Sequence, residues 1–268
     1  MSVLDQSTVL ITGASSGLGA EFARQLAPRA RCIILAARRA DRLQALAEEI
    51  AHPGLTVHCL TVDLGSEEST RRFLTELAGL GPKIDFLINN AGLGDHGLFE
   101  ESDWSRVQAM IEVNIRALTQ VTHAVLRDLI LSRRGAILNV SSIASLLPIP
   151  QMAVYAATKA YVTSFSEALR AELRGTGVSV TAVCPGPVDT EFFVVAERPD
   201  STGEQAAPNS FKIPAEQVVR EGLAAVEHDR ARVIPGWFVF LTMTLAASVP
   251  FFVLRFFLNQ RGRGYTGH

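Results

Sequence analysis

The feature that most constrains the fold is an alternation along the first two hundred residues. Short apolar, β-branched runs alternate with longer stretches in which apolar residues recur every three or four positions. The short runs predict buried strands, and the longer stretches predict helices that lay one face on them. Repeated strand–helix units build a parallel sheet whose right-handed crossovers put helices on both faces. We therefore expect a single α/β domain with a doubly wound, Rossmann-type parallel sheet.

The pattern also predicts where the elements lie. The expected domain spans residues 1–235 and is followed by an apolar helical tail at 236–268. A stretch rich in Pro, Gly, Ser and Ala at 197–210 follows the sixth strand and is expected to be a lid over a ligand site at the carboxyl ends of the strands. Strands are expected at 9–12, 32–36, 56–62, 86–89, 136–140, 178–183 and near Val233, and helices at 18–26, 41–50, 67–77, 104–131, 153–173 and 215–227.

Composition narrows the function classes. The chain has 48% hydrophobic and 19% charged residues and a formal net charge of −2, which suits a globular protein and gives no basic face for nucleic acid. Cys32, Cys59 and Cys184 lie far apart in apolar runs, as expected for buried thiols in a reducing compartment. The histidines have no metal-ligand spacing, and residues 1–8 have no signal-peptide layout. We expect a cytoplasmic protein without a metal.

A glycine-rich turn links the first expected strand to the first expected helix. Gly13 can make the tight turn, Gly17 can admit a pyrophosphate, and Gly19 lets the helix sit close to the sheet. The free N–H groups at the helix start suit phosphate. The alternative is an ordinary turn and helix cap. The residues expected to contact a dinucleotide here are Gly13, Ser15, Ser16, Gly17, Leu18 and Gly19.

The end of the second expected strand indicates which nucleotide is bound. An NAD-binding fold places an acidic side chain there for the ribose, but this chain has Ala37 followed by Arg38 and Arg39. A guanidinium offers forked, permanently charged donors that suit a 2′-phosphate. The alternative is that both arginines simply solvate the start of the next helix. The sequence thus favours NADP over NAD.

A tyrosine, a lysine and a serine form the candidate catalytic group. Tyr155 and Lys159 are spaced at i and i+4, so they share one face of a helix. A nearby cation can lower the pKa of a tyrosine by about 1–3 units, so we expect Lys159 to make Tyr155 a proton donor and acceptor near neutrality. Ser142 follows the fifth expected strand, at the same edge as the glycine turn.

Six motifs in order resemble those of the short-chain dehydrogenases/reductases, in the subgroup of chains of about this length. They are TGASSGLG at 12–19, NNAG at 89–92, Asn114, the Ser142, Tyr155 and Lys159 set, PG at 185–186, and Val188 with Thr190. The resemblance covers roughly residues 5–235. It implies an oxidoreductase that transfers hydride between a nicotinamide and a carbonyl or secondary alcohol, and that usually forms homodimers or homotetramers.

The resemblance also implies roles for individual residues. Tyr155 would be the general acid or base, Ser142 would hold the carbonyl, and Asn114 would support a proton path through Lys159, which would also bind the nicotinamide ribose. The alternatives to these functional roles are that Asn114 only bonds its helix neighbours, that Asp63 only caps a helix, and that Ser141 holds the carbonyl in place of Ser142. The remaining nucleotide contacts implied are Asp63, Leu64, Asn90, Ala91, Gly92, Pro185, Gly186, Val188 and Thr190.

The expected substrate is a lipophilic carbonyl compound. Residues 143–150 are mostly apolar, and Phe192 and Phe193 follow the last motif, so an apolar rim is expected around the catalytic group. We predict an NADPH-dependent carbonyl reductase acting on an oxo-acyl or steroid-like ketone. The alternatives are an NAD-dependent polyol or hydroxy-acid dehydrogenase and a non-catalytic nucleotide-sensing scaffold.

The tail is the part of the sequence that this function does not explain. Residues 233–254 carry no charge, and Pro250 divides the run into the pieces 237–249 and 251–258. From Arg230 onward there are five arginines and no acidic residue. The tail is expected to attach peripherally to a membrane or to line a lipid-facing pocket. The alternatives are burial against a partner subunit and a true membrane span.

Overall fold

The computed structural model describes residues 2–198, 212–250 and 252–256. The described residues contain a seven-stranded parallel sheet in the order β3-β2-β1-β4-β5-β6-β7, so the doubly wound fold class is confirmed. Every strand predicted from the sequence is present with its bounds within one residue. The strands are β1 (Thr8–Thr12), β2 (Cys32–Ala37), β3 (Thr56–Thr61), β4 (Phe86–Asn89), β5 (Gly135–Val140), β6 (Val178–Val183) and β7 (Arg232–Val233).

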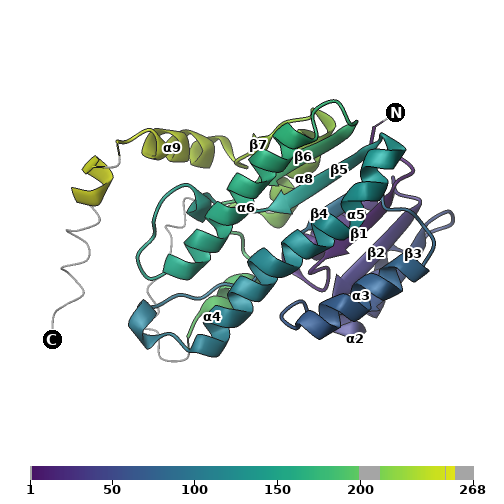
Figure 1. The fold of residues 1–268 in the computed structure, drawn as a ribbon, viewed down its shortest axis with the longest axis horizontal. Helices are drawn as coiled ribbons and strands as arrows, with labels where there is room; N and C mark the ends of the chain where they lie inside the picture. Colours follow the sequence, from purple (N-terminus) through teal and green to yellow (C-terminus); the bar gives the residue numbers. More distant parts are fainter. Residues whose placement is uncertain (1, 199–211, 251, 257–268) are drawn as a thin grey trace.

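Helices cover both faces of this sheet, as Figure 1 shows. Side chains from α1, α2 and α8 join one buried cluster, and side chains from α3, α5 and α6 join the cluster on the opposite face. The helices are α1 (Gly17–Leu26), α2 (Ala40–Ile50), α3 (Glu67–Gly79), α4 (Trp104–Ile111), α5 (Leu118–Ser132), α6 (Ala153–Glu172), α7 (Glu191–Ala196), α8 (Ala215–Glu227) and α9 (Trp237–Ala247).

The two cores arise from the alternation of side chains along each strand. On β1, Val9 and Ile11 pack on the face that carries Phe22 of α1, while Leu10 packs on the face that carries Phe73 of α3. All five are at most 2% exposed. Each fully buried apolar side chain of this size contributes about 1.5–3 kcal/mol, so a continuous apolar strand stabilises both layers at once.

One predicted helix differs in the structure, one short helix was not predicted, and the predicted lid is mostly not described. The helix expected over 104–131 is interrupted by a π-helical segment, Glu112–Ala117, which lies between α4 and α5. Asn114 in this segment is bonded to Leu93 and to Thr158, and a π-helical turn commonly accommodates such a side chain at a functional site. The short helix α7 was not expected. Most of the predicted lid at 197–210 lies outside the described residues.

The order of the sheet reverses between β1 and β4, and the loops after these strands touch. The Asn90 side chain donates to the carbonyl oxygens of Thr12 and Gly13 at 3.0 and 3.1 Å. A ligand crevice forms at such a reversal because the two following chain segments leave in opposite directions. The fold therefore places the two glycine-containing motifs of the sequence side by side.

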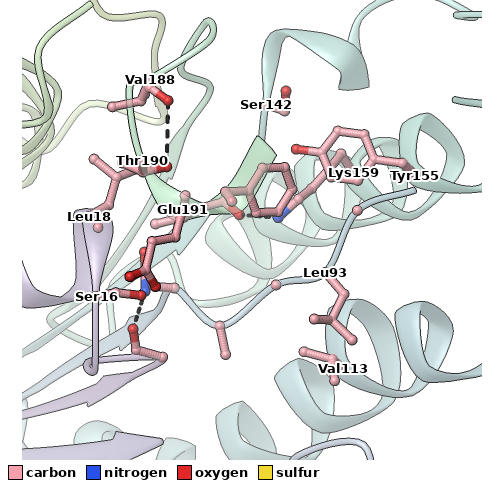
Figure 2. Close-up of a pocket in the computed structure, with 18 of the residues that line it drawn as sticks. Ser16, Leu18, Leu93, Val113, Ser142, Tyr155, Lys159, Val188, Thr190 and Glu191 are labelled. Atoms are coloured by element: carbon pink, nitrogen blue, oxygen red, sulfur yellow. Dashed lines mark hydrogen bonds between the residues drawn. The ribbon is translucent and has the colours of Figure 1, made fainter. Parts of the chain in front are cut away.

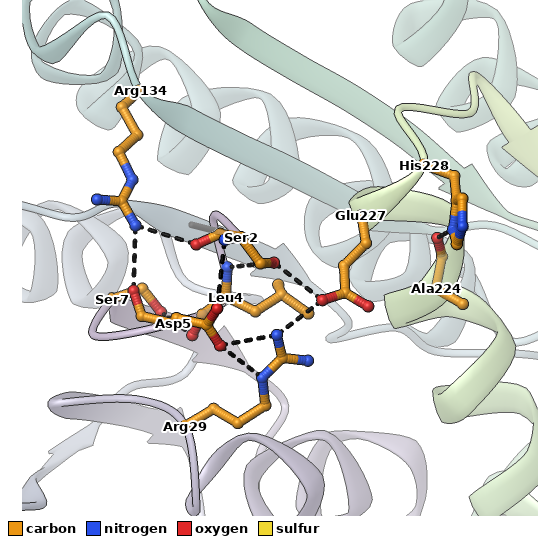
Figure 3. A network of polar contacts seen from close by, with 9 residues as sticks. All are labelled: Ser2, Leu4, Asp5, Ser7, Arg29, Arg134, Ala224, Glu227 and His228. Carbon is orange, nitrogen blue, oxygen red and sulfur yellow. Dashed lines mark hydrogen bonds and ion pairs between the residues drawn. The ribbon is translucent and has the colours of Figure 1, made fainter.

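A polar network closes the opposite edge of the sheet, where the strands begin. Arg29 bridges Asp5 and Glu227 with contacts of 2.7 Å to each, and Arg134 donates to the carbonyl oxygens of Ser2 and Asp5 (Figure 3). These groups are partly exposed, and such ion pairs contribute little to stability. Their place at the amino ends of the strands separates them from the ligand crevice.

The packing of Gly19 gives a test of the fold. A Cβ at Gly19 would lie 2.3 Å from the Gly13 carbonyl oxygen, whereas nothing lies within 4 Å of a Cβ at Gly79. We expect Gly19→Ala to lower the free energy of unfolding by about 1–3 kcal/mol, because backbone would have to move. Urea denaturation measures this, with Gly79→Ala as the matched control. Equal stability of the two variants would contradict the close approach.

Candidate active site

A cavity of about 500 Å³ opens at the carboxyl ends of the strands. It runs from the glycine turn after β1, past the loops after β2, β3 and β4, to Tyr155 and Lys159 on α6. Figure 2 shows the residues around it, with Ser16 and Leu18 near one end and Ser142 with Tyr155 near the other. An elongated cavity of this kind suits a ligand with chemically different ends.

The glycine end fits a dinucleotide phosphate group. Gly13 and Gly17 have φ values of +67° and +54°, which favour glycine, and a Cβ at Gly13 would lie 2.8 Å from Ala91 Cα. Helix α1 begins at Gly17, and the side chain of its N-cap residue, Ser16, makes no capping hydrogen bond. The first amide groups of the helix are therefore available to an anion.

Arg38 and Arg39 both line the cavity, as predicted, but their surroundings differ. Arg38 is exposed, whereas Arg39 donates to the Ser16 hydroxyl at 2.7 Å and to the Glu191 carboxylate at 2.9 Å. Arg42 binds the same carboxylate at 2.6 Å, and the two arginines lower the pKa of Glu191 to about 2. A hydrogen bond and two ion pairs thus link the glycine turn, the start of α2 and the start of α7.

Glu191 is a cavity residue that the sequence analysis did not identify. It lies some 150 residues from its partners in the sequence, so no local pattern links it to them. Only the fold, which brings the first residue of α7 over the start of α2, shows the contact.

Asn114 lies just beneath the cavity and anchors the loop that lines it. Its side chain accepts from the Leu93 amide at 2.8 Å and donates to the Leu93 carbonyl and the Thr158 hydroxyl at 2.9 Å each. A Cβ at Gly92 would lie 3.3 Å from Lys159 Nζ and 3.5 Å from Asn114 Oδ1. Gly92 therefore permits Asn114 and Lys159 to lie close to the same turn of backbone.

Ser142, Tyr155 and Lys159 meet at the far end of the cavity. Ser142 lies two residues beyond the end of β5, and its hydroxyl accepts from the Ala144 amide at 3.1 Å, whereas Ser141 donates to the Lys159 carbonyl oxygen and bonds the Thr163 hydroxyl. Lys159 Nζ donates to the Val140 carbonyl oxygen at 2.9 Å and lies 5.9 Å from the centre of the Tyr155 ring. Of the two serines, Ser142 is the one that acts on the pKa of Tyr155, which it lowers.

Burial controls the titration of both groups. It raises the pKa of Tyr155 to about 12, although the bond from Ser142 acts in the opposite direction, and it lowers the pKa of Lys159 to about 8. The sequence-based expectation of a lowered pKa for Tyr155 is therefore wrong here, because desolvation by burial is the largest cause of the shift. At neutral pH the phenol carries its proton and can donate it.

Apolar side chains surround this catalytic end. Phe192 packs against Tyr155 with ring centroids 5.6 Å apart, and a Cβ at Gly94 would lie 2.8 Å from the Phe192 ring. The side chain of Phe193 lies outside the described part of the chain. The other apolar residues lining this end are Leu93, Ala109, Ile143, Ala144, Ile149, Met152, Pro187 and Val188.

The structure brings nearly all the predicted site residues to one cavity. Gly19 and Asn114 do not line it but pack directly behind residues that do. Asp63 accepts from the Gly65 amide at 2.9 Å, so it shapes its own turn as well as lining the cavity. The predicted residues that line the cavity are Gly13, Ser15, Ser16, Gly17, Leu18, Arg38, Arg39, Asp63, Leu64, Asn90, Ala91, Gly92, Ser142, Tyr155, Lys159, Pro185, Gly186, Val188 and Thr190.

The burial of Lys159 predicts a cost to stability. Its ammonium is charged at pH 7 although burial lowers its pKa from 10.5 to about 8, so the penalty is present below pH 8 and is relieved between pH 8 and 10.5. We expect Lys159→Met to stabilise the nucleotide-free protein at pH 7 by about 1–3 kcal/mol, part of which the lost Val140 bond offsets.

Thermal unfolding at pH 7 and at pH 10 measures this effect. The gain should shrink at the higher pH, and the exposed Lys83→Met should show no gain at either pH. A destabilised Lys159→Met protein at pH 7 would contradict the assignment of burial as the dominant cause.

Comparison with known proteins places the site in a family. A family model described as short chain dehydrogenase matches residues 7–200. Sulfoacetaldehyde reductase 2 of Chromohalobacter salexigens is 37% identical over 90% of each chain, and serine 3-dehydrogenase of Rhizobium radiobacter is 38% identical over 76% of this chain and 80% of its own. A short-chain dehydrogenase from Sphingobium yanoikuyae in complex with NADPH superposes with a TM-score of 0.78 at 31% identity, covering 91% and 96% of the two chains.

These matches agree with the motifs found in the sequence and with the seven-stranded sheet. They extend over the glycine turn, the Ser142, Tyr155 and Lys159 group and most of the chain between them. The chain is an oxidoreductase and belongs to the short-chain dehydrogenase/reductase family.

Proposed function

We propose that the protein is an NADPH-dependent reductase of uncharged, apolar ketones or aldehydes. The observation that carries the proposal is one continuous cavity with two chemically distinct ends. One end offers glycine backbone, a helix start and two arginines, and the other offers Ser142 and Tyr155 within an apolar wall. The first end suits a nucleotide, and the second suits a carbonyl group attached to a hydrophobic body.

The wall near Tyr155 favours an uncharged substrate. Among the described residues lining this end, Lys159 is the charged one, and it already donates to the Val140 carbonyl. Arg198, in the same region of the fold, donates to both oxygens of the buried Asp95 at 3.1 and 2.6 Å and does not line the cavity. Arg106 pairs with the same carboxylate at 3.4 Å, and it does not line the cavity either. A sulfonate or a carboxylate would lose its hydration here without gaining a cation.

The named substrates of the relatives therefore differ from the one proposed here. Sulfoacetaldehyde and serine are small and charged, and each would require a charged partner beside the reacting carbon. The matches to these relatives, at 37–38% identity, cover 76–90% of this chain and so include the candidate nucleotide and proton-transfer machinery. The substrate end of a fold varies independently of that machinery.

In the proposed reaction, Tyr155 donates its proton to the carbonyl oxygen. NADPH, when bound, would supply the hydride that the carbonyl carbon accepts and would leave as NADP⁺, so that the carbonyl would become an alcohol and the Tyr155 phenol a phenolate. The Ser142 hydroxyl holds the oxygen beside the phenol. Lys159 stabilises the phenolate as it forms and binds the nicotinamide ribose. Asn114 is proposed as a positioning residue that fixes the Leu93 backbone next to Lys159.

Activity with a panel of carbonyl compounds tests this function. We expect the purified protein to reduce an aryl or long-chain aliphatic ketone with NADPH much faster than sulfoacetaldehyde. Tyr155→Phe should lower the rate by about 10² to 10⁴, because only the transferable proton is removed, while leaving NADPH affinity nearly unchanged.

Three results would overturn the proposal. One is a Tyr155→Phe protein that retains a tenth of the wild-type rate. Another is a preference for polyols or hydroxy acids with NAD, which would favour a dehydrogenase role. A protein that binds nucleotide but turns over no member of the panel would instead favour a nucleotide-sensing scaffold.

The nucleotide preference rests on Arg38 and Arg39. Removing one charged hydrogen-bond partner costs about 1.5–3 kcal/mol, so Arg38→Ala should weaken NADPH binding by about one to two powers of ten with little effect on NADH. Fluorescence titration with each nucleotide measures this. Arg71→Ala on α3, whose partner is Glu67, serves as the control. Equal affinity of the wild type for both nucleotides would refute the preference.

A further inference from the structure

The helix α9 is exposed on most of its surface although it is almost wholly apolar. Val239 and Met243 pack into the core of the domain. Around them the helix exposes Trp237, Phe238, Phe240, Leu241 and Leu245, with exposed fractions from 43% to 79%. Figure 1 shows α9 leaving the domain next to β7 and extending away from the sheet.

The apolar exposure continues past the end of the helix. Val249, Phe252 and Phe256 are also exposed, and residues 252–256 are again helical after Pro250. Eight of the fourteen exposed large apolar side chains in the described residues therefore lie within 237–256. We call this the tail surface. A large exposed apolar surface of this kind marks a site that binds another apolar surface, such as a protein or a membrane.

Two hydroxyl groups on α9 and at its C-cap are already bonded within the helix. The Thr242 hydroxyl donates to the Phe238 carbonyl at 2.7 Å, and the Ser248 hydroxyl donates to the Thr244 carbonyl at 2.8 Å. Hydroxyl groups that bond within their own helix can enter hydrocarbon without losing a partner. A helix that is apolar on nearly every side also suits lipid better than a flat protein interface, which would cover one side.

Charge supplies the second argument for a lipid partner. From Arg230 to the end of the chain there are five arginines and no acidic residue, although the whole protein has a net charge of −2. One of the five, Arg232, is paired with Glu167 at 2.9 Å. An arginine held near an anionic lipid surface contributes about 1 kcal/mol. A second copy docked through the same surface would present the same positive segment, which disfavours a symmetric contact.

Length argues against a span. No helix in the described part of the chain is long and apolar enough to cross a membrane. The eleven residues of α9 extend about 16 Å at 1.5 Å per residue, against a hydrocarbon core of about 30 Å. We propose that the tail surface docks on a bilayer that contains anionic lipid, with α9 lying in the interface.

The start of α9 is linked to the substrate end of the cavity through Ile213. A Cβ at Gly236, the N-cap of α9, would lie 2.7 Å from the Ile213 side chain. Ile213 donates its amide to the Pro187 carbonyl at 3.1 Å and pairs with Val188, and both partners line the cavity. This part of the inference rests on the proposed function: docking would bring the apolar end of the cavity near lipid-dissolved ketones.

Co-sedimentation with vesicles tests the docking. Full-length protein is mixed with vesicles of phosphatidylcholine alone or with an equal amount of phosphatidylglycerol. We expect sedimentation with the anionic vesicles and at least ~10-fold weaker binding to the neutral ones. The double variant Phe240→Ser/Leu245→Ser should bind the anionic vesicles at least ~10-fold more weakly. Leu131→Ser on α5, which is equally exposed, should bind like the wild type.

Fluorescence gives a second readout of the same contact. In a Trp104→Phe background Trp237 is the remaining tryptophan, and its emission should shift to the blue on anionic vesicles. Reduction of a water-soluble ketone by the double variant should equal that of the wild type, since neither residue lines the cavity.

Failure to sediment with either vesicle, or unchanged binding of the double variant, would overturn the proposal. A double variant that turns an oligomer into monomers, in a protein that binds no vesicle, would make the tail an assembly surface. Binding is measured without nucleotide or substrate. A protein that docks but reduces no ketone therefore retains this inference and loses the proposed function.

Discussion

The bond from the Asn90 side chain to the carbonyls of Thr12 and Gly13 ties together the two loops at which the sheet reverses. Thr12 reinforces the same junction, because its hydroxyl accepts from the amides of Asn90 and Ala91 at 3.1 Å each. This apposition leaves no room for a Cβ at Gly13 or Gly19. The start of α1 is thereby held against the loop after β4, and the nucleotide end of the cavity lies between them.

The loop after β4 also contacts residues at the other end of the cavity, where Tyr155 and Lys159 lie. Two residues beyond Asn90, Gly92 lies against Lys159 Nζ and Asn114 Oδ1, and Asn114 holds the next residue, Leu93, by both backbone groups. The candidate nucleotide cradle and the candidate catalytic side chains thus contact one segment, residues 90–93. Fixing this segment matters for the proposed reaction, because proton and hydride transfer depend on close placement of the reacting atoms.

Burial at the catalytic end favours the neutral form of both titrating groups. It raises the pKa of Tyr155 to about 12 and lowers that of Lys159 to about 8. Holding a charged lysine in an apolar setting is unfavourable, and such arrangements are common at functional sites. A buried phenol beside an ammonium is prepared to lose its proton only when an acceptor arrives.

The sequence by itself determined the fold class, the family and most of the cavity lining, because these depend on local regularities. Apolar alternation specifies strands, glycine spacing specifies the turn after β1, and an i, i+4 spacing places Tyr155 and Lys159 on one helix face. The boundary between the domain at 1–235 and the tail stays a prediction. Tertiary structure alone decided the joining of Glu191 to Arg39 and Arg42, the π-helical turn at Asn114 and the direction of the Tyr155 pKa shift. Each of these depends on contacts between distant segments and on how much water they exclude, and no local pattern encodes either quantity.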